Sequence, residues 1–213
     1  MKEKKRYYLF EITWIFTIGA FLGYLVETLW HLIKYHEYIN KQGLLYGPFK
    51  PIYGLGAVLI TIIFSKVRKD NYIKTFCLGT ILGTIYEYLC SAFQEYVFKT
   101  STWSYEKFNW NLNGRIYLPY CLAWGIICIL WINYLYPFLK KYLNQINQKT
   151  YRYLSIILTI FMAINIILTT TAVIRTSIRN RSDKTTYVFR FIDDYYSNEY
   201  MHRKFPKMEF LEK

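Results

Sequence analysis

Long stretches without a charged side chain constrain the fold of this sequence more than any other feature. They occupy residues 14–26, 51–65, 75–86, 116–139 and 153–174. A segment that crosses a bilayer must be a helix of about 20 apolar residues, because hydrocarbon offers peptide groups no hydrogen-bond partner. The pattern predicts an all-α integral membrane protein rather than a soluble helical one. Five transmembrane helices are expected over residues 8–33, 49–66, 72–98, 115–139 and 152–175.

Basic residues gather in the connections between these stretches. Residues 2–6, 66–74 and 140–152 each contain four Lys or Arg residues, and such connections tend to stay in the cytoplasm. We therefore expect a multi-pass protein of the cell membrane with a cytoplasmic N-terminus and with Lys41 and Lys107 outside. The tail opposes this assignment through Arg175, Arg179, Arg181 and Lys184. The net charge of +13 indicates a partnership with membrane lipids, not with nucleic acid.

Two segments of the chain have the same form. Residues 40–48 read NKQGLLYGP and residues 111–119 read NLNGRIYLP, while FTIGAFLGYLVE (16–27) and FCLGTILGTIYE (76–87) precede them. This predicts two parallel two-helix repeats, related by a pseudo-two-fold axis along the membrane normal. The repeats span residues 8–66 and 72–139, the second with a loop insertion. A basic flank (1–7) precedes them, and a fifth helix (152–175) and an amphipathic, interfacial tail (177–213) follow.

Each repeat contains a pair of glycines one helical turn apart. These are Gly19 and Gly23 in the first repeat, and Gly79 and Gly83 in the second. A Gly-x-x-x-Gly stripe lets two helices approach closely. We expect helices one and three to contact each other through these four glycines.

A glutamate follows each glycine pair by one turn, Glu27 in the first repeat and Glu87 in the second. An intramembrane carboxylate is costly unless it is paired, protonated or hydrated, so it is a functional candidate. Arg115, at the position of Leu44 in the first repeat, is the expected partner of these carboxylates, and Lys50 is a second counter-charge. The predicted ligand-binding pocket comprises Glu27, Tyr53, Glu87, Gln94, Glu95, Trp103, Tyr105, Asn111, Asn113 and Arg115.

The inserted loop, residues 102–110, reads TWSYEKFNW. Trp and Tyr residues collect at headgroup depth in membrane proteins, so this loop is either part of an interfacial belt or a lid over the pocket. Cysteines and histidines are scattered without metal-ligand spacing, so neither a metal nor another cofactor is expected. They are Cys77, Cys90, Cys121, Cys128, His31, His36 and His202.

Three stretches carry a resemblance to a known family. GPFKPIYGLG (47–56), EYLCSAFQEYVF (87–98) and DDYYSNEYMHRKFPKM (193–208) resemble the CmpB-like family of ABC-transporter type IV membrane proteins. The family's Asn-Arg-Gly is Lys41-Gln42-Gly43 here, and its Trp-Asp-Tyr-Ser is residues 103–106, WSYE. The resemblance implies a transporter permease.

Three classes of function fit these features. The first is a transporter permease or solute-binding membrane component, and the second is a membrane scaffold or regulatory partner. The third, a membrane-embedded enzyme acting on lipid, is disfavoured because no catalytic constellation accompanies the glutamates. The sequence contains no Gly-x-x-x-x-Gly-Lys-(Ser/Thr) motif, which forms the phosphate cradle of many ATPases. A transporter of this kind would need a separate ATPase subunit and, with five helices, self-association into a homo-oligomer.

Overall fold

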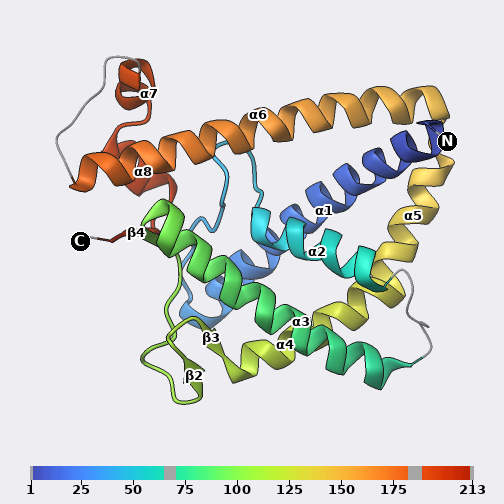
Figure 1. The fold of residues 1–213 in the computed structure, drawn as a ribbon, viewed down its shortest axis with the longest axis horizontal. Helices are drawn as coiled ribbons and strands as arrows, with labels where there is room; N and C mark the ends of the chain where they lie inside the picture. Colours follow the sequence, from blue (N-terminus) through green and yellow to red (C-terminus); the bar gives the residue numbers. More distant parts are fainter. Residues whose placement is uncertain (1, 65–70, 182–188, 212–213) are drawn as a thin grey trace.

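The computed structural model describes residues 2–64, 71–181 and 189–211 and is mostly helical, at 76% (Figure 1). Its helices and short strands follow in chain order. They are α1 (Lys2–Tyr35), α2 (Pro51–Phe64), α3 (Tyr72–Phe93), the π-helical turn η1 (Gln94–Phe98), β1 (Thr100–Ser101), β2 (Asn111–Leu112), β3 (Ile116–Tyr117), α4 (Leu118–Leu130), the π-helical turn η2 (Trp131–Leu135), α5 (Tyr136–Gln145), α6 (Gln148–Arg181), α7 (Arg190–Tyr195), α8 (Asn198–Lys204) and β4 (Glu209–Phe210).

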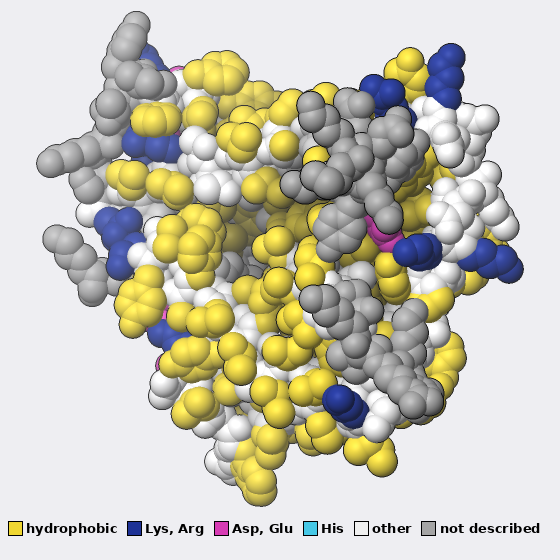
Figure 2. Space-filling model, turned by 45° about the vertical axis from the view of Figure 1, so that its right-hand side comes forward, with side chains coloured by type: hydrophobic (Ala, Val, Ile, Leu, Met, Phe, Trp, Pro, Cys, Tyr) yellow, Lys and Arg dark blue, Asp and Glu magenta, His cyan; other side chains and the backbone are white. Residues whose placement is uncertain are grey.

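Four helical segments in the described residues are long and apolar enough to cross a membrane. They are Leu9–Tyr35, Tyr72–Phe98, Leu118–Gln145 and Gln148–Arg181. The second predicted span, 49–66, corresponds to α2, which has 14 residues and therefore extends only about 21 Å at 1.5 Å per residue. Residues 65 and 66 lie outside the described residues. Hydrophobic side chains spread over the face drawn in Figure 2, as contact with lipid requires.

Local sequence signals set several helix ends. Pro51 opens α2, where its missing N–H costs no helical hydrogen bond. Asn71 caps α3 by accepting a hydrogen bond from the Lys74 N–H at 2.9 Å. His36 and Lys99 follow α1 and η1 with left-handed backbone, at φ 54° and 53°, a conformation that commonly terminates helices.

The first four long elements form two antiparallel pairs, since α2 packs along α1 and α4 packs along α3. A core of buried side chains joins α1 and α2 to α4 and η2. It contains Ile15, Ala57, Ile60, Phe64, Cys128, Trp131 and Ile132. The first part of α6 packs against the first part of α1, and α6 then diverges from α1 toward the C-terminal elements α7 and α8 (Figure 1).

The glycine stripes pack inside each pair, not between the pairs. A Cβ added at Gly19 would lie 2.7 Å from the Cβ of Ala57 in α2, and one added at Gly79 would lie 2.5 Å from the Cβ of Cys128 in α4. The nearest neighbours of Gly23 and Gly83 are Tyr53 and Trp124 respectively. The prediction that helices one and three meet through these glycines is therefore wrong. The stripes instead make room for the second helix of each pair and for one aromatic ring on it.

Replacing Gly83 by Ala should destabilise the protein by about 1–3 kcal/mol, because the new methyl group overlaps Trp124 in a packed interior. Gly56→Ala is the matched control, since its Cβ would meet nothing closer than 3.4 Å and alanine has the higher helix propensity. Thermal unfolding in detergent measures both variants. Equal melting temperatures for the two would contradict the close packing at Gly83.

The two similar segments differ in local structure. Residues 40–48 form neither helix nor strand and lie against α6. The Leu45 N–H donates to Thr169 Oγ1 at 3.0 Å, and Tyr46 exchanges hydrogen bonds with the Asn165 side chain at 3.2 and 2.6 Å. Asn165 is 1% exposed. These polar side chains of α6 give irregular backbone the partners that lipid cannot supply.

The second segment, residues 111–119, includes a hairpin of β2 and β3. Asn113 and Gly114 occupy its turn with φ of 55° and 66°, values that Asn and Gly tolerate best. The Asn111 side chain accepts a hydrogen bond from the Gly114 N–H at 2.9 Å. The shared sequence pattern thus recurs in two different loop conformations at corresponding places along the chain.

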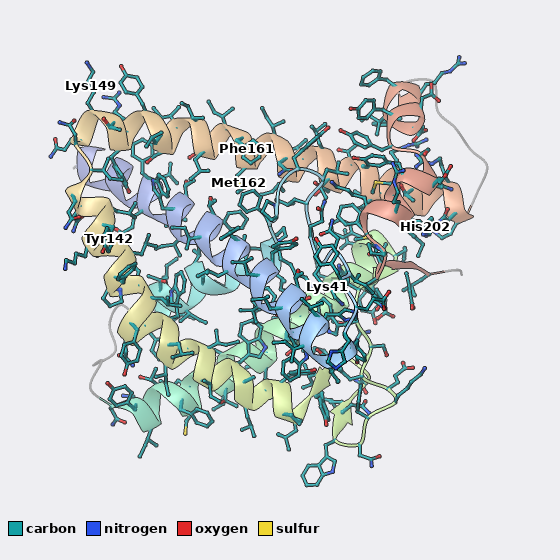
Figure 3. The ribbon with its side chains drawn as sticks, turned by 180° about the vertical axis from the view of Figure 1, so that it is seen from behind. Lys41, Tyr142, Lys149, Phe161, Met162 and His202 are labelled. Atoms are coloured by element: carbon teal, nitrogen blue, oxygen red, sulfur yellow. The ribbon has the colours of Figure 1, made fainter. Side chains whose placement is uncertain are left out.

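The tail packs against the same end of the molecule as these loops. Strand β4 pairs antiparallel with β1, and Tyr196, Met201 and Phe205 form a core with Leu45 and with two residues of α6, Ala172 and Val173. Lys41 and His202 lie toward this end, while Tyr142 and Lys149 lie toward the opposite end (Figure 3).

Candidate functional site

Two equivalent aromatic residues meet where the helix pairs adjoin. Tyr53 of α2 covers Gly23, and Trp124 of α4 covers Gly83. Their rings stack on each other with centroids 5.8 Å apart and an interplanar angle of 26°. The small glycines allow each ring to reach this contact, which brings the two predicted glutamates toward a common centre. We call Glu27, Tyr53, Glu87, Tyr105 and Trp124 the glutamate cluster.

Glu87 is the most enclosed carboxylate of this cluster, at 6% exposed. Trp124 donates its indole N–H to Oε2 at 2.9 Å, and the Tyr105 hydroxyl donates to Oε1 at 3.0 Å. Both donors are neutral. Among the ion pairs of the described residues none includes Glu87. A buried carboxylate held by neutral donors keeps lone pairs and charge available for a proton or a cation.

Glu27 has a different environment. The Lys50 ammonium forms an ion pair with its carboxylate, and the Tyr53 hydroxyl lies beside it. Lys50 is 8% exposed. Its backbone N–H donates a hydrogen bond to the backbone carbonyl of Ala20 in α1 at 2.9 Å. Lys50 therefore provides the second counter-charge that we expected. Two carboxylates and one ammonium leave the centre of the cluster with a formal charge of minus one when both acids are ionised.

Arg115 does not contact either of these glutamates. Its guanidinium pairs with Glu95 at 2.5 Å and donates to Ser91 at 3.5 Å. It also lies over the rings of Tyr88 and Tyr96. The prediction that Arg115 pairs with Glu87 or Glu27 is therefore wrong. Glu95 lies eight residues beyond Glu87, about 12 Å further along the helix, and its side chain is 42% exposed, so this pair costs less desolvation.

The inserted loop contributes one residue to the cluster and leaves others at the surface. Tyr105 reaches Glu87, whereas Trp110 is 76% exposed and Phe108 is 42% exposed. Burial, followed by the charge of Glu87, raises the pKa of Tyr105, so its hydroxyl remains a donor at neutral pH. Part of the loop thus covers Glu87, and its tip has the exposed aromatic character of an interfacial belt.

The other predicted pocket residues hold the loop in place. Trp103 donates to the carbonyl of Arg115 at 3.2 Å, and Gln94 donates to the Thr102 hydroxyl at 2.7 Å. Asn111 donates to the carbonyl of Phe108 at 2.6 Å and accepts from the Gly114 N–H, and Asn113 donates to Tyr88 at 3.1 Å. These side chains make none of the hydrogen bonds of the two cluster glutamates.

Sequence reasoning missed one residue of the cluster, Trp124, and one that holds residues 40–48 in place, Asn165. Trp124 aligns with Tyr53 in the repeat, and that alignment could have identified it as a partner of Glu87. Asn165, a buried amide within an uncharged span, could have been recognised as a partner for irregular backbone. No group of three or more His, Cys, Asp or Glu residues in the described chain is arranged to bind a metal ion.

Comparisons with known proteins identify a family for most of this chain. The model of the family described as "Putative ABC-transporter type IV" matches residues 14–170, a range that contains every residue of the glutamate cluster and ends before α7 and α8. No curated protein and no solved structure matches the chain. Because the matched range covers most of the sequence, the chain belongs to this family, the CmpB-like ABC-transporter type IV proteins.

Proposed function

We propose that this chain is the permease or solute-binding component of a transporter and that the glutamate cluster is its polar pocket. The observation that carries the proposal is Glu87, a 6% exposed carboxylate on an apolar, membrane-length helix. Both of its side-chain hydrogen-bond donors among the described residues are neutral. Ionisable groups in such positions commonly mark substrate or ion pathways. Family membership supports the transport role.

We further propose that the two helix pairs are parallel repeats about an axis along the membrane normal. Equivalent contacts support this, since Gly23 packs on Tyr53 as Gly83 packs on Trp124. Tyr53 and Trp124 then stack across the junction of the pairs, where an axis relating them would pass. Sites at the junction of repeats are typical of transporters, because relative movement of the repeats exposes them in turn.

Hydrolysis of ATP would come from a separate ATPase subunit, since the sequence has no Gly-x-x-x-x-Gly-Lys-(Ser/Thr) motif. We propose self-association as well, because four long helices and the shorter α2 enclose little space for a conduit. Membrane lipids are the remaining partners.

Reconstitution of the full chain in liposomes with an ATPase encoded beside it tests this proposal. We expect the chain to retain the ATPase at the membrane and to raise its ATP hydrolysis several-fold. A scaffold or regulatory partner is the second candidate, favoured by the structural use of polar groups such as Asn165. If the ATPase is retained and its rate of ATP hydrolysis is unaffected by substitutions in the glutamate cluster, the result would support the scaffold and contradict the permease.

The orientation is also a proposal, with the N-terminus in the cytoplasm of a cell-membrane protein. A membrane-impermeant maleimide added to intact cells should label Lys41→Cys and leave Asn144→Cys unlabelled, following the distribution of basic residues. The native protein is the control, since its four cysteines lie inside candidate spans. Lys69, another useful position, lies outside the described residues. Labelling of Asn144→Cys alone would invert the orientation.

A further inference from the structure

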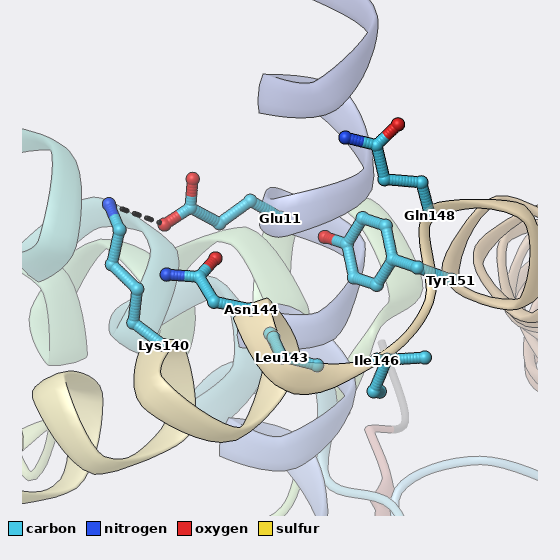
Figure 4. Close-up of a pocket in the computed structure, with 7 residues that line it drawn as sticks. All are labelled: Glu11, Lys140, Leu143, Asn144, Ile146, Gln148 and Tyr151. Carbon is cyan, nitrogen blue, oxygen red and sulfur yellow. Dashed lines mark ion pairs between the residues drawn. The ribbon is translucent and has the colours of Figure 1, made fainter.

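A pocket of about 350 Å³ is drawn in Figure 4. It lies in the part of the molecule that contains Tyr142 and Lys149, toward the end opposite His202 in Figure 3. Three segments build it, namely α1, α5 with the connection after it, and the start of α6. Its lining residues are Glu11, Lys140, Leu143, Asn144, Ile146, Gln148 and Tyr151. This volume is at the lower end of the range of about 300–1,000 Å³ for small-ligand pockets. The proposed transport site does not include any of these residues.

The polar lining is zwitterionic. Glu11 and Lys140 form an ion pair at 3.3 Å, with side chains 24% and 51% exposed. Tyr136 fixes the Glu11 carboxylate by donating a hydrogen bond at 2.8 Å. In Figure 4 the Asn144 amide lies next to the pair, and the Gln148 amide lies on the far side of Glu11 from Lys140; both add neutral donors. A ligand that carries both an amine and a phosphate would find a partner for each charge.

The pocket lies where membrane-length helices end. The candidate spans Leu9–Tyr35, Leu118–Gln145 and Gln148–Arg181 each have an end beside it. Leu143 and Ile146 form its apolar wall, and the neighbouring α5 side chains Phe138 and Tyr142 are 61% and 52% exposed. Exposed aromatic residues at helix ends are typical of headgroup depth. At this depth, membrane lipids are therefore the potential ligands with the highest local concentration.

We propose that this pocket binds the phosphoethanolamine headgroup of a membrane lipid. The ammonium group binds the Glu11 carboxylate, while the phosphate binds Lys140 and the Asn144 amide. Charge-assisted hydrogen bonds of this kind are roughly twice as strong as hydrogen bonds between neutral groups. An anionic headgroup without an amine would place its charge near Glu11 uncompensated. A choline headgroup has no N–H to donate.

Native mass spectrometry of the delipidated full chain tests the proposal with three lipids of identical acyl chains. We expect phosphatidylethanolamine to bind about tenfold more tightly than phosphatidylglycerol or phosphatidylcholine, the factor that one additional strong contact supplies. Lys140→Gln should reduce phosphatidylethanolamine binding by a similar factor. Lys141→Gln, the exposed neighbour outside the pocket, should leave it unchanged. Glu11→Gln should shift the preference toward phosphatidylglycerol.

Equal binding of the three lipids, or equal effects of Lys140→Gln and Lys141→Gln, would overturn the site. Asn144→Ala should also weaken phosphatidylethanolamine binding. Because this position is exposed, the variant should fold normally and so tests the site even if the charge variants misfold. Water-soluble phosphoethanolamine is the second probe, measured by thermal shift. If it stabilises the protein while phosphatidylethanolamine does not bind, the lipid assignment fails and the pocket belongs to a soluble solute.

Discussion

Replacement of Asp193 by Asn should release the C-terminal tail from α6 and reduce the stability of the protein by about 3–5 kcal/mol, the usual cost of breaking a buried ion pair. Asp193 is 8% exposed and Arg175 is 5% exposed. The carboxylate accepts hydrogen bonds from Arg175 at 3.0 and 2.5 Å and pairs with Arg179. The asparagine leaves the buried guanidinium of Arg175 and the partly buried guanidinium of Arg179 without their counter-charge.

The neighbouring residue provides a matched control. Asp194 has a side chain that is 74% exposed and lies 3.9 Å from Arg190, so Asp194→Asn should change stability by less than about 0.5 kcal/mol. Thermal unfolding measures stability, and hydrogen exchange over residues 189–211 reports docking of the tail. Tail protection that is the same in both variants would contradict the role of Asp193.

The same ion pair fixes how tail docking depends on pH. The hydrogen bond from Arg175, together with the charge of Arg179, holds the pKa of Asp193 below its ordinary value of 3.8. A depressed pKa contributes stability that is fully present above the ordinary value and is lost as pH falls through the folded value. The hydrogen-exchange protection factors of the tail, taken relative to the intrinsic exchange rate at each pH, should therefore stay constant from neutral pH down to about 5. They should decrease once the pH falls below 3.8.

The second large effect is expected at Lys50. Lys50→Met should reduce stability by about 3 kcal/mol, because it leaves the Glu27 carboxylate without its cation. The value is at the lower end of the range for buried pairs because the Glu27 side chain is 27% exposed. Lys107→Met, at an exposed position of the inserted loop, should change stability by less than about 0.5 kcal/mol.

A double variant separates lost charge pairing from lost packing. Glu27→Gln removes the surplus charge, so Lys50→Met combined with Glu27→Gln should be more stable in thermal unfolding than Lys50→Met alone. Arg115→Leu should cost less than Lys50→Met, since the Glu95 side chain that it leaves behind is 42% exposed. A larger loss for Arg115→Leu would show that Arg115, rather than Lys50, is the principal counter-charge near the pocket.

The sequence was most informative about segments whose physics is local. Uncharged stretches predicted four of the long apolar helices because crossing a bilayer imposes both length and composition. The hairpin of β2 and β3 was not predicted, although Asn113-Gly114 is a standard turn pair. The glycine pairs correctly indicated that another helix approaches closely at those positions. A stripe of small residues does not specify which helix that is.

Contacts between distant residues were harder to predict. Arg115 occupies the expected loop, but the hairpin directs its side chain to Glu95, and no spacing in the sequence reports that direction. Lys50 reaches Glu27 because its backbone N–H is held against α1 at Ala20, a contact that depends on how residues 40–48 fold. Asp193 joins Arg175 and Arg179 across 18 and 14 residues, and opposite charges are too common in the tail to identify the pair in advance.

The most direct test of the proposed transport pocket is ATP hydrolysis by the reconstituted complex when Glu87 is replaced by Gln. The glutamine keeps the size of the side chain but carries no charge. Its amide oxygen can accept the hydrogen bond from Trp124, and its amide N–H can donate to the Tyr105 hydroxyl. Glu106→Gln makes the same chemical change at an exposed position of the inserted loop. We expect Glu87→Gln to fold normally and to lose at least about 90% of the stimulated hydrolysis, a loss of about 1.4 kcal/mol or more in transition-state stabilisation. Glu106→Gln should retain this activity, and full activity in Glu87→Gln would contradict a functional role for the glutamate cluster.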